Sequence, residues 1–247
     1  MAGVDPITVN GEERIVHSIP NVPITVERKP YINYDKHSAL QQPSVARANL
    51  APSAESPHGS TENEWAKKHA HQTVLQQHCD FFDRDHDSIL WPQDTFVGFH
   101  RLGYNAIFCF VAMLVIHINF SYATCSSWLP DPFFRLFLVN VHRARHGSDT
   151  QTYDPEGRFQ PARFEEIFSK YAGGRDYLTI GDFPNMLRGQ RNISDPIGWG
   201  GFIFEWSATW IMLWPEDGRM MKEDIRAIYD GSIFYKVAER RENKKKW

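Results

Sequence analysis

The chain has few cysteines, no excess of basic residues and no apolar run of membrane-spanning length, and each absence excludes a class of protein. Its 3 cysteines, Cys79, Cys109 and Cys125, are odd in number and form no C-x-x-C pair, which argues against a disulfide framework and favours a reducing compartment. The formal net charge is −3, so the composition predicts no nucleic-acid partner. The N-terminus lacks a basic start followed by an apolar run, so we expect no signal peptide.

Residues 1–62 are rich in proline, serine, asparagine and charge and show no sustained hydrophobic period. The stretch 41–61 in particular has too little apolar surface to offset the entropy lost on ordering. We therefore expect residues 1–62 to form a mobile arm. Order is expected to begin near Glu62, with a helix from Trp65 to Phe82 that ends where an acidic cluster starts.

Residues 83–94 (DRDHDSILWPQD) carry acidic side chains at alternate positions between two expected helices. A twelve-residue EF-hand loop supplies calcium with oxygen ligands from positions 1, 3 and 5, from a backbone carbonyl at position 7 and from a carboxylate at position 12. These positions are Asp83, Asp85, Asp87, Ile89 and Asp94. A solvated acidic turn is the alternative, but the spacing favours a calcium site within residues 63–104.

This loop departs from the usual EF-hand pattern at two positions. Position 6 is Ser88 instead of glycine, although the turn there favours a positive φ. Position 12 is Asp94, which is one methylene shorter than glutamate, so bidentate coordination is harder and Mg²⁺ competes better. We expect the site to exist and leave its affinity open.

Three later segments resemble the loop weakly, at residues 152–163, 171–182 and 213–224. Each has an apolar residue at position 8, namely Phe159, Leu178 and Met220, but most of the acidic ligands are missing. We interpret them as degenerate EF-hand-like loops that pair without metal, although chance spacing of Gly/Asp turns would give the same pattern. The predicted class is therefore mainly α, built from helix-loop-helix units, with a C-terminal helical region over residues 142–247.

The most apolar part of the chain lies within residues 105–141. A helix over Ala106 to Phe120 would be about 22 Å long, whereas the hydrocarbon core of a bilayer is about 30 Å thick. Pro130 and Pro132 then break the chain before a second apolar arm at residues 136–139. Two short arms around a proline turn fit an apolar helical hairpin that enters one leaflet or the monolayer of a lipid droplet. A buried core helix fits the same run equally well.

Three long blocks of this sequence resemble the caleosins, in the same order and at plausible spacing. They are LQQHCDFFDRDHDSILWPQDTFVGFHRLGYN, LPDPFFRLFLVNVHRARHGSDTQTYDPEGRF and EWSATWIMLWPEDGRMMKEDIRAIYDGSIF. The likeness runs from about Trp65 to about Ala238. The proline turn is shorter than in plant members, which puts strong droplet targeting in doubt.

The resemblance implies a calcium-binding haem protein on the cytosolic face of lipid droplets and of endoplasmic reticulum or microsomal membranes. Caleosins act as peroxygenases, which transfer oxygen from a fatty-acid hydroperoxide to unsaturated fatty acids by epoxidation or hydroxylation. The implied cofactors are haem b and Ca²⁺. Haem binding in the family is attributed to two histidines, which correspond here to His78 in LQQH and His146 in HGSD.

His78 and His146 are thus the candidate catalytic and cofactor-binding residues. One of them would be the proximal haem ligand, and the other a distal ligand or an acid–base group for the hydroperoxide proton. Asp149 is placed to hydrogen-bond the His146 ring, and Arg143 and Arg145 could pair with propionates or with a fatty-acid carboxylate. A solvated basic helix end is the alternative for this segment.

Two other functions remain open at this point. One is a non-enzymatic, calcium-responsive structural protein of lipid droplets, in which the histidines are incidental. The other is a soluble EF-hand sensor, which would need a second competent calcium loop. Neither the preferred fatty acid nor the oligomeric state, including a homo-oligomer, is predicted from the sequence.

Overall fold

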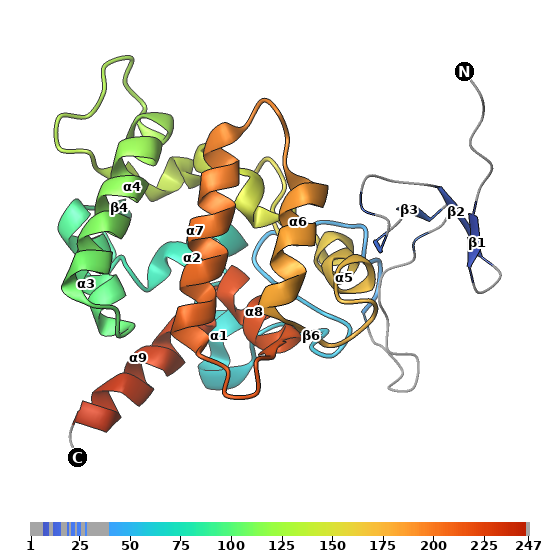
Figure 1. The fold of residues 1–247 in the computed structure, drawn as a ribbon. Helices are drawn as coiled ribbons and strands as arrows, with labels where there is room; N and C mark the ends of the chain where they lie inside the picture. The colour runs from blue at the N-terminus through green and yellow to red at the C-terminus, as the bar shows by residue number, and fades with distance from the viewer. Residues whose placement is uncertain are drawn as a thin grey trace.

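A computed structural model describes residues 7–9, 12–15, 19, 21–22, 24–25, 28 and 40–245. The expected mainly helical class is confirmed (Figure 1). The helices are α1 (Trp65–Lys68), α2 (Val74–Asp80), α3 (Pro92–Arg101), α4 (Ala106–Thr124), α5 (Pro161–Lys170), α6 (Phe183–Gln190), α7 (Pro196–Leu213), α8 (Lys222–Tyr229) and α9 (Ser232–Lys245). The 3-10 helices are η2 (Glu62–Glu64), η3 (Leu138–Ala144), η4 (Gly147–Asp149) and η5 (Ile180–Asp182).

The strands are all short. β1 (Ile7–Val9), β2 (Glu12–Ile15) and β3 (Ile24–Thr25) form an antiparallel sheet in that order. The other four are β4 (Ile89–Leu90), β5 (Leu136–Phe137), β6 (Tyr177–Leu178) and β7 (Met220–Met221). These four join in two antiparallel ladders, β4 with β5 and β6 with β7.

The two ladders join helix-loop-helix units in pairs. In the first ladder Leu90, which follows the acidic loop, lies opposite Leu136. In the second, Leu178 lies opposite Met220. The segments at residues 171–182 and 213–224 thus lie side by side through β6 and β7. Phe159 of the third degenerate loop instead bridges to Arg47 and Tyr153.

Local sequence explains where the helices begin. The Thr73 side chain accepts from the Gln76 N–H and the Gln76 side chain accepts from the Thr73 N–H, which forms a capping box at the start of α2. Asn105 caps α4 by accepting from Phe108 N–H, and Asp195 caps α7 by accepting from Gly198 N–H. α3, α5, α6 and α7 have a proline in their first turn, where its missing N–H leaves no intrahelical bond unmade.

The buried apolar side chains form two clusters. One surrounds Phe164 and Phe168 of α5 and extends to Trp206 of α7. The other surrounds Phe81 of α2 and Phe234 of α9, and Met212 of α7 belongs to it. α7 therefore contributes to both cores and lies along the boundary between them.

α4 and α7 are apolar on nearly all sides instead of along one stripe. In the part of the chain that the structure describes, α4 is the one helix long and apolar enough to cross a membrane, and 22 % of its most apolar window is buried. The two helices touch where the Phe108 ring stacks on Phe204, with ring centroids 5.3 Å apart. Ile107 and Ile118 of α4 and Ile203 of α7 are exposed, so a wide apolar surface covers both helices.

The expected apolar hairpin is realised only in its first arm. α4 has 19 residues, which makes it longer than the apolar run, and His117 faces the protein, where it hydrogen-bonds Thr95 Oγ1 at 2.8 Å and the Phe134 carbonyl at 2.6 Å. Beyond the proline turn the chain forms β5 and η3 instead of a second apolar helix. Leu136 and Leu138 are buried because this arm pairs with β4. The tip of the turn stays exposed, with Trp128 94 % accessible.

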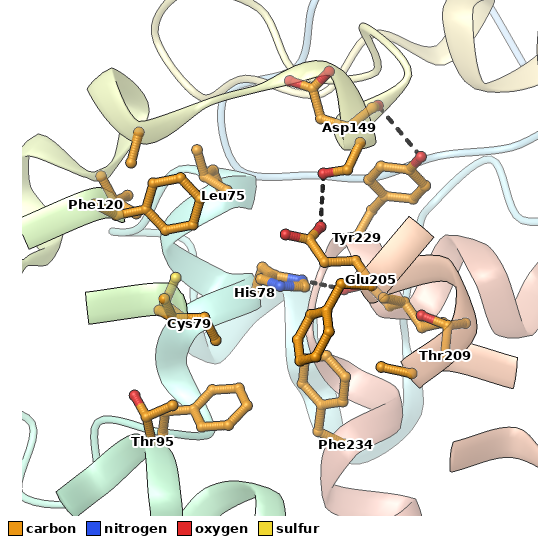
Figure 2. Close-up of a pocket in the computed structure, with 18 of the residues that line it drawn as sticks. Leu75, His78, Cys79, Thr95, Phe120, Asp149, Glu205, Thr209, Tyr229 and Phe234 are labelled. Atoms are coloured by element: carbon orange, nitrogen blue, oxygen red, sulfur yellow. Dashed lines mark hydrogen bonds between the residues drawn. The ribbon is translucent and has the colours of Figure 1, made fainter. Parts of the chain in front are cut away.

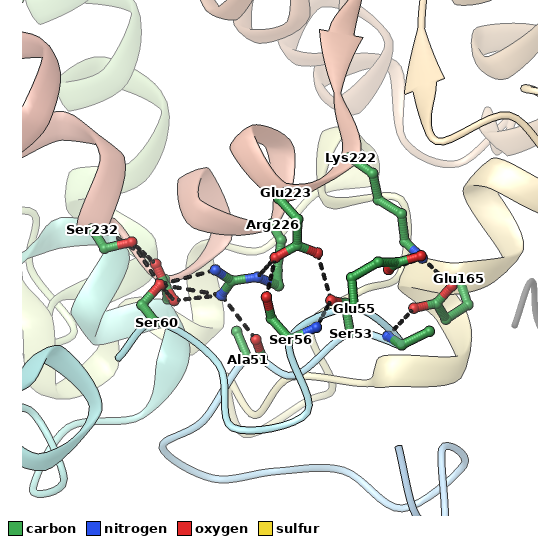
Figure 3. Close-up of polar contacts among 12 residues, drawn as sticks. Ala51, Ser53, Glu55, Ser56, Ser60, Glu165, Lys222, Glu223, Arg226 and Ser232 are labelled. Atoms are coloured by element: carbon green, nitrogen blue, oxygen red, sulfur yellow. Dashed lines mark hydrogen bonds and ion pairs between the residues drawn. The ribbon is translucent and has the colours of Figure 1, made fainter. Parts of the chain in front are cut away.

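The segment before α1 also differs from the expectation of a mobile arm. Most of residues 1–39 lie outside the described residues, but residues 51–60 pack against α5 and α8 (Figure 3). The Ala54 N–H donates to Glu165 at 2.9 Å, Ser53 donates to Glu223 at 2.5 Å, and Ser60 donates to Asp230 at 2.6 Å. Side-chain and backbone hydrogen bonds hold this segment, with little apolar surface involved.

Candidate active site

A cavity of about 250 Å³ lies at the boundary between the two cores. Pockets for small ligands typically measure about 300–1,000 Å³, so this one lies just below that range. Side chains from α2, α4, α7, α8 and α9 line it, together with the segment around η4. Its apolar wall includes Leu75, Phe82, Phe120, Phe204, Met212 and Phe234.

His78 projects from α2 into this cavity (Figure 2). Its Nδ1 lies 2.7 Å from the Ile228 carbonyl oxygen. A carbonyl can only accept, so Nδ1 carries the proton and Nε2 keeps its lone pair. Burial lowers the pKa of His78, which keeps the ring neutral at pH 7. A neutral imidazole with its Nδ1 held in this way is typical of a metal ligand.

A glycine lets the backbone after α8 come close to His78. Gly231 has φ +75°, and a Cβ on it would lie 2.3 Å from the Gln77 carbonyl oxygen. A side chain there would push α9 away from α2. The Phe234 ring at the start of α9 contacts the His78 ring edge-on, with centroids 5.3 Å apart.

His146 lines the same cavity from the segment just before η4. Its ring stacks on Phe120 of α4, with centroids 4.8 Å apart. Asp195 accepts from the Gly147 N–H at 2.9 Å, which ties this segment to the first turn of α7. A Cβ on Gly201 would lie 2.7 Å from the His146 ring, so this glycine of α7 makes room for the imidazole.

Both ring nitrogens of His146 have partners, and these are not the expected ones. Nε2 lies 3.1 Å from Glu205 Oε1, and Nδ1 lies 3.0 Å from Ser148 Oγ. Asp149, the expected partner, accepts instead from the Gln151 N–H at 2.7 Å and pairs with Arg145 at 3.7 Å. Burial raises the pKa of Asp149 to about 6.

Glu205 is the site residue that the sequence reasoning missed. It is the only charged residue in the 18 residues of α7, and this isolation in an apolar helix was an available signal. Its carboxylate lines the cavity, and its Oε2 accepts from Ser148 Oγ at 2.6 Å (Figure 2). Burial alone would raise the pKa of Glu205, but the hydrogen bond and the charge of His146 outweigh it and lower the pKa. The same carboxylate raises the pKa of His146, although burial opposes this.

Of the two candidate arginines, Arg145 lines the cavity and Arg143 does not, and the neighbouring Cys79 is a neutral part of the cavity wall. Arg145 donates to the Tyr153 carbonyl at 3.0 Å, and its buried Nε has no hydrogen-bond partner in the described part of the chain. Arg143 is exposed and takes no part in the wall. Burial raises the pKa of Cys79 to about 12, so this thiol stays protonated and acts as a small apolar side chain.

The acidic loop brings three of its four predicted carboxylates together. Asp83, Asp85 and Asp87 each offer an oxygen within 4.8 Å of the others. Asp83 Oδ1 is buried and has no hydrogen-bond partner among the described residues. Burial and the charges of the other two carboxylates raise the pKa of Asp83. Such crowding of like charges is stabilised by a cation.

Positions 6, 7 and 12 of the loop agree only in part with the geometry expected of a calcium loop. Ser88 has φ +65°, so the predicted positive φ at position 6 is confirmed. Ile89, whose carbonyl is the predicted ligand at position 7, opens β4. Asp94 stays apart from the other carboxylates, because its oxygens accept from the Trp91 N–H at 3.0 Å and from Arg84 at 3.2 Å.

Comparison with known proteins relates the sequence of this chain to one family. The family model "Caleosin related protein" matches residues 70–238. The chain is 38 % identical over 233 residues to "Peroxygenase" from Lilium longiflorum, covering 94 % of this chain and 95 % of that protein. It is 37 % identical over 171 residues to "Probable peroxygenase 4" from Arabidopsis thaliana, covering 69 % and 88 %. No solved structure matches the chain significantly.

Proposed function

Since this chain belongs to the caleosin family, we propose that it is a haem peroxygenase that transfers oxygen from fatty-acid hydroperoxides to unsaturated fatty acids. The observation that carries this proposal is His78, whose Nδ1 is held by the Ile228 carbonyl at 2.7 Å inside an apolar cavity. Two curated relatives named as peroxygenases, at 38 % and 37 % identity, support the activity.

The donor set of the cavity fits a haem group. The Nε2 of His78 would hold the iron as a nitrogen ligand, and the fixed Nδ1–H would make that nitrogen more basic. Aromatic and aliphatic side chains offer the apolar walls that a macrocycle needs. Arg145, with its buried and unpartnered Nε, suits a propionate or the carboxylate of the substrate. When bound, haem supplies the redox chemistry of oxygen transfer.

His146 serves a different purpose from His78 in this proposal. Both of its nitrogens are hydrogen-bonded within the protein, so it would have to give up these bonds to bind iron. It is instead suited to relay a proton along these hydrogen bonds, between the hydroperoxide and the oxygen that leaves as alcohol. The apolar walls orient the acyl chain and exclude bulk water.

We assign the loop at residues 83–94 to calcium. The unpartnered Asp83 Oδ1 and the converging carboxylates of Asp85 and Asp87 support this site. Ile89 would add its carbonyl, and Asp94 would join after its side chain leaves Arg84. The loop begins three residues after α2 ends at Asp80. Calcium would thus fix the end of the helix that carries His78.

The apolar surface of α4 is suited to a lipid droplet or to the endoplasmic reticulum membrane on its cytosolic face. Trp128 and Phe133 at the exposed proline turn extend this surface with aromatic side chains, which favour membrane interfaces. Ile203 and Ile211 widen it along α7. Because α4 and α7 also line the cavity, a fatty acid dissolved in lipid would meet the site directly.

Oxygen transfer can be followed with a labelled hydroperoxide. The haem-loaded protein is incubated in mild detergent with a monounsaturated fatty acid and a fatty-acid hydroperoxide that carries a heavy oxygen isotope in both peroxide atoms. We expect an epoxide with one labelled oxygen and an alcohol with the other. Unlabelled epoxide, or no epoxide, would reject the peroxygenase function and leave a calcium-binding protein of lipid surfaces.

A further inference from the structure

We infer that Glu205 is a positioning residue of the cavity, which fixes the His146 ring and shares one proton with it during cleavage of the hydroperoxide. The inference rests on the proposed function and deepens it, because it identifies the group that makes His146 an acid–base residue. Three observations carry it: the isolation of the charge in α7, the proton count of its hydrogen bonds, and its place in the cavity wall.

The isolation of the charge is the first observation. Every other residue of α7, from Pro196 to Leu213, is uncharged, and the helix presents Ile203 and Ile211 to its exposed side. The Glu205 side chain keeps 46 % of its surface accessible, so the charge is isolated in the helix without being fully buried. Glu205 is directed at the cavity and is paired there with His146 and Ser148.

The second observation is the number of protons that the three side chains hold. Ser148 has one hydroxyl proton, and the 2.6 Å contact with Glu205 Oε2 uses it. Ser148 Oγ can then only accept from His146, so Nδ1 carries a proton across the 3.0 Å contact. The 3.1 Å contact between Nε2 and Glu205 Oε1 holds one more proton, which either atom can carry.

The network is therefore complete with one proton shared between an imidazole and a carboxylate. A ring that uses both nitrogens in this way has no lone pair left for iron. His78 differs, because within the described residues only its Nδ1 has a hydrogen-bond partner. The geometry gives the two histidines separate tasks, with His78 toward the cofactor and His146, held by Glu205, toward the proton.

Cleavage of a hydroperoxide ROOH requires such a group. The O–O bond breaks, the terminal oxygen goes to the alkene, and the other oxygen leaves as the alcohol ROH. The hydroperoxide is reduced and the alkene is oxidised by the same pair of electrons. The proton has to move from the terminal oxygen to the leaving oxygen. The pair of Glu205 and His146 takes up that proton and gives one back, so it ends in its starting state.

The test uses the full-length, haem-loaded protein with cumene hydroperoxide. This probe yields cumyl alcohol when the O–O bond breaks with proton transfer and acetophenone when it breaks into radicals. We expect Glu205→Gln to keep the wild-type haem content, to lose about 100-fold or more in turnover, and to shift product toward acetophenone. Ser207→Ala, an exposed polar position of the same helix outside the cavity wall, is the matched control.

Two results would overturn the inference. One is wild-type turnover with an unchanged product ratio in Glu205→Gln, and the other is loss of haem from a variant that still folds. The double variant with His146→Ala should be no slower than the slower single variant, and additive losses would also contradict the pairing. If wild-type protein with full haem makes no cumyl alcohol, the proposed function fails, and the product ratio distinguishes this from failure at Glu205.

A measurement without haem tests the pairing even if the activity is absent. In protein with nitrogen-labelled histidine, Glu205→Gln should move the ring-nitrogen resonances of His146 toward those of a neutral tautomer, while the circular dichroism spectrum stays unchanged. Unchanged His146 resonances would show that the carboxylate holds no share of its proton and would overturn the inference.

Discussion

The two β ladders join loops of the same geometry that differ in how their carboxylates are neutralised. In the second ladder's loop at residues 171–182, Arg175 at position 5 pairs with Asp182 at position 12 at 2.9 Å. In the first ladder's loop at residues 83–94, Asp83, Asp85 and Asp87 form no ion pair with any lysine or arginine of residues 40–245. Arg84 likewise pairs with Asp94 at position 12 of the first loop, at 3.2 Å. The two loops therefore differ in the three clustered carboxylates of the first, which no lysine or arginine of the described residues neutralises.

The same contrast extends to other turns of the molecule. Asp131 at the proline turn pairs with Arg135 at 2.8 Å, and Asp154 pairs with Arg158 at 2.5 Å. A guanidinium that bridges a turn closes it permanently, whereas a bound metal ion closes it only when calcium is present. The comparison predicts that the loop at residues 83–94 responds to calcium and that the loop at residues 171–182 does not. α2, which carries His78 into the cavity, ends three residues before the first of these loops.

The largest expected effect is a loss of folding stability when the buried cation of Lys222 is removed. Lys222, directly after β7, is buried and pairs with Glu165 at 2.6 Å and with Glu55 at 2.7 Å (Figure 3). Lys222→Met would leave the Glu165 carboxylate buried and unpaired, which costs about 3–5 kcal/mol in the free energy of unfolding. Urea denaturation measures this, with the exposed Lys67→Met as control. Equal stability of both variants would contradict the structural role of the internal cation.

The next-largest expected effect is on calcium binding by the loop at residues 83–94. Asp83→Asn should weaken calcium binding on the order of 100-fold, because it removes a buried ligand charge. Asp182→Asn in the matching loop should leave calcium binding unchanged, since that loop lacks a cluster of acidic ligands like that of Asp83, Asp85 and Asp87. Isothermal titration calorimetry compares the two variants. Similar affinities for calcium in both would remove the distinction between the loops.

The smallest expected effect is on stability when Arg175, which pairs with Asp182 beside the second ladder, is replaced. Arg175→Gln leaves Asp182 with hydrogen bonds from the Thr179 N–H at 2.7 Å and from its hydroxyl at 2.9 Å, so we expect a loss of only about 1 kcal/mol. Thermal denaturation measures it, and Arg163→Gln, an exposed arginine on α5, is the control. Calcium added to the Arg175→Gln protein should not restore its stability, because the loop lacks the other ligands.

Patterns that are local in the sequence predicted structure well. The apolar residue at position 8 located both partners of the second ladder, Leu178 and Met220. The alternating carboxylates located the cluster at Asp83, and the need for a positive φ at Ser88 was correct. The position of Asp94 was not predictable, because Arg84 of the same loop competes for its carboxylate.

The features that the sequence did not predict depend on contacts between distant parts of the chain. The polar segment at residues 51–60 looked unable to fold, but its partners Glu165 and Glu223 lie more than 100 residues away. Glu205 and Ser148 are 57 residues apart in the sequence, and no local spacing pattern predicts a contact over that separation. The second apolar arm was taken for part of a hairpin because its pairing with β4 through Leu136 is equally distant.

If His78 and His146 have different tasks at one haem site, replacing each of them should affect haem binding differently. The full-length protein is reconstituted with haem in mild detergent, and the absorption spectra of the wild type, His78→Ala and His146→Ala are compared. The account predicts a Soret band at near-equal haem stoichiometry in the wild type and in His146→Ala, and its loss in His78→Ala. A Soret band that survives in His78→Ala, or that is absent from the wild type, would contradict it.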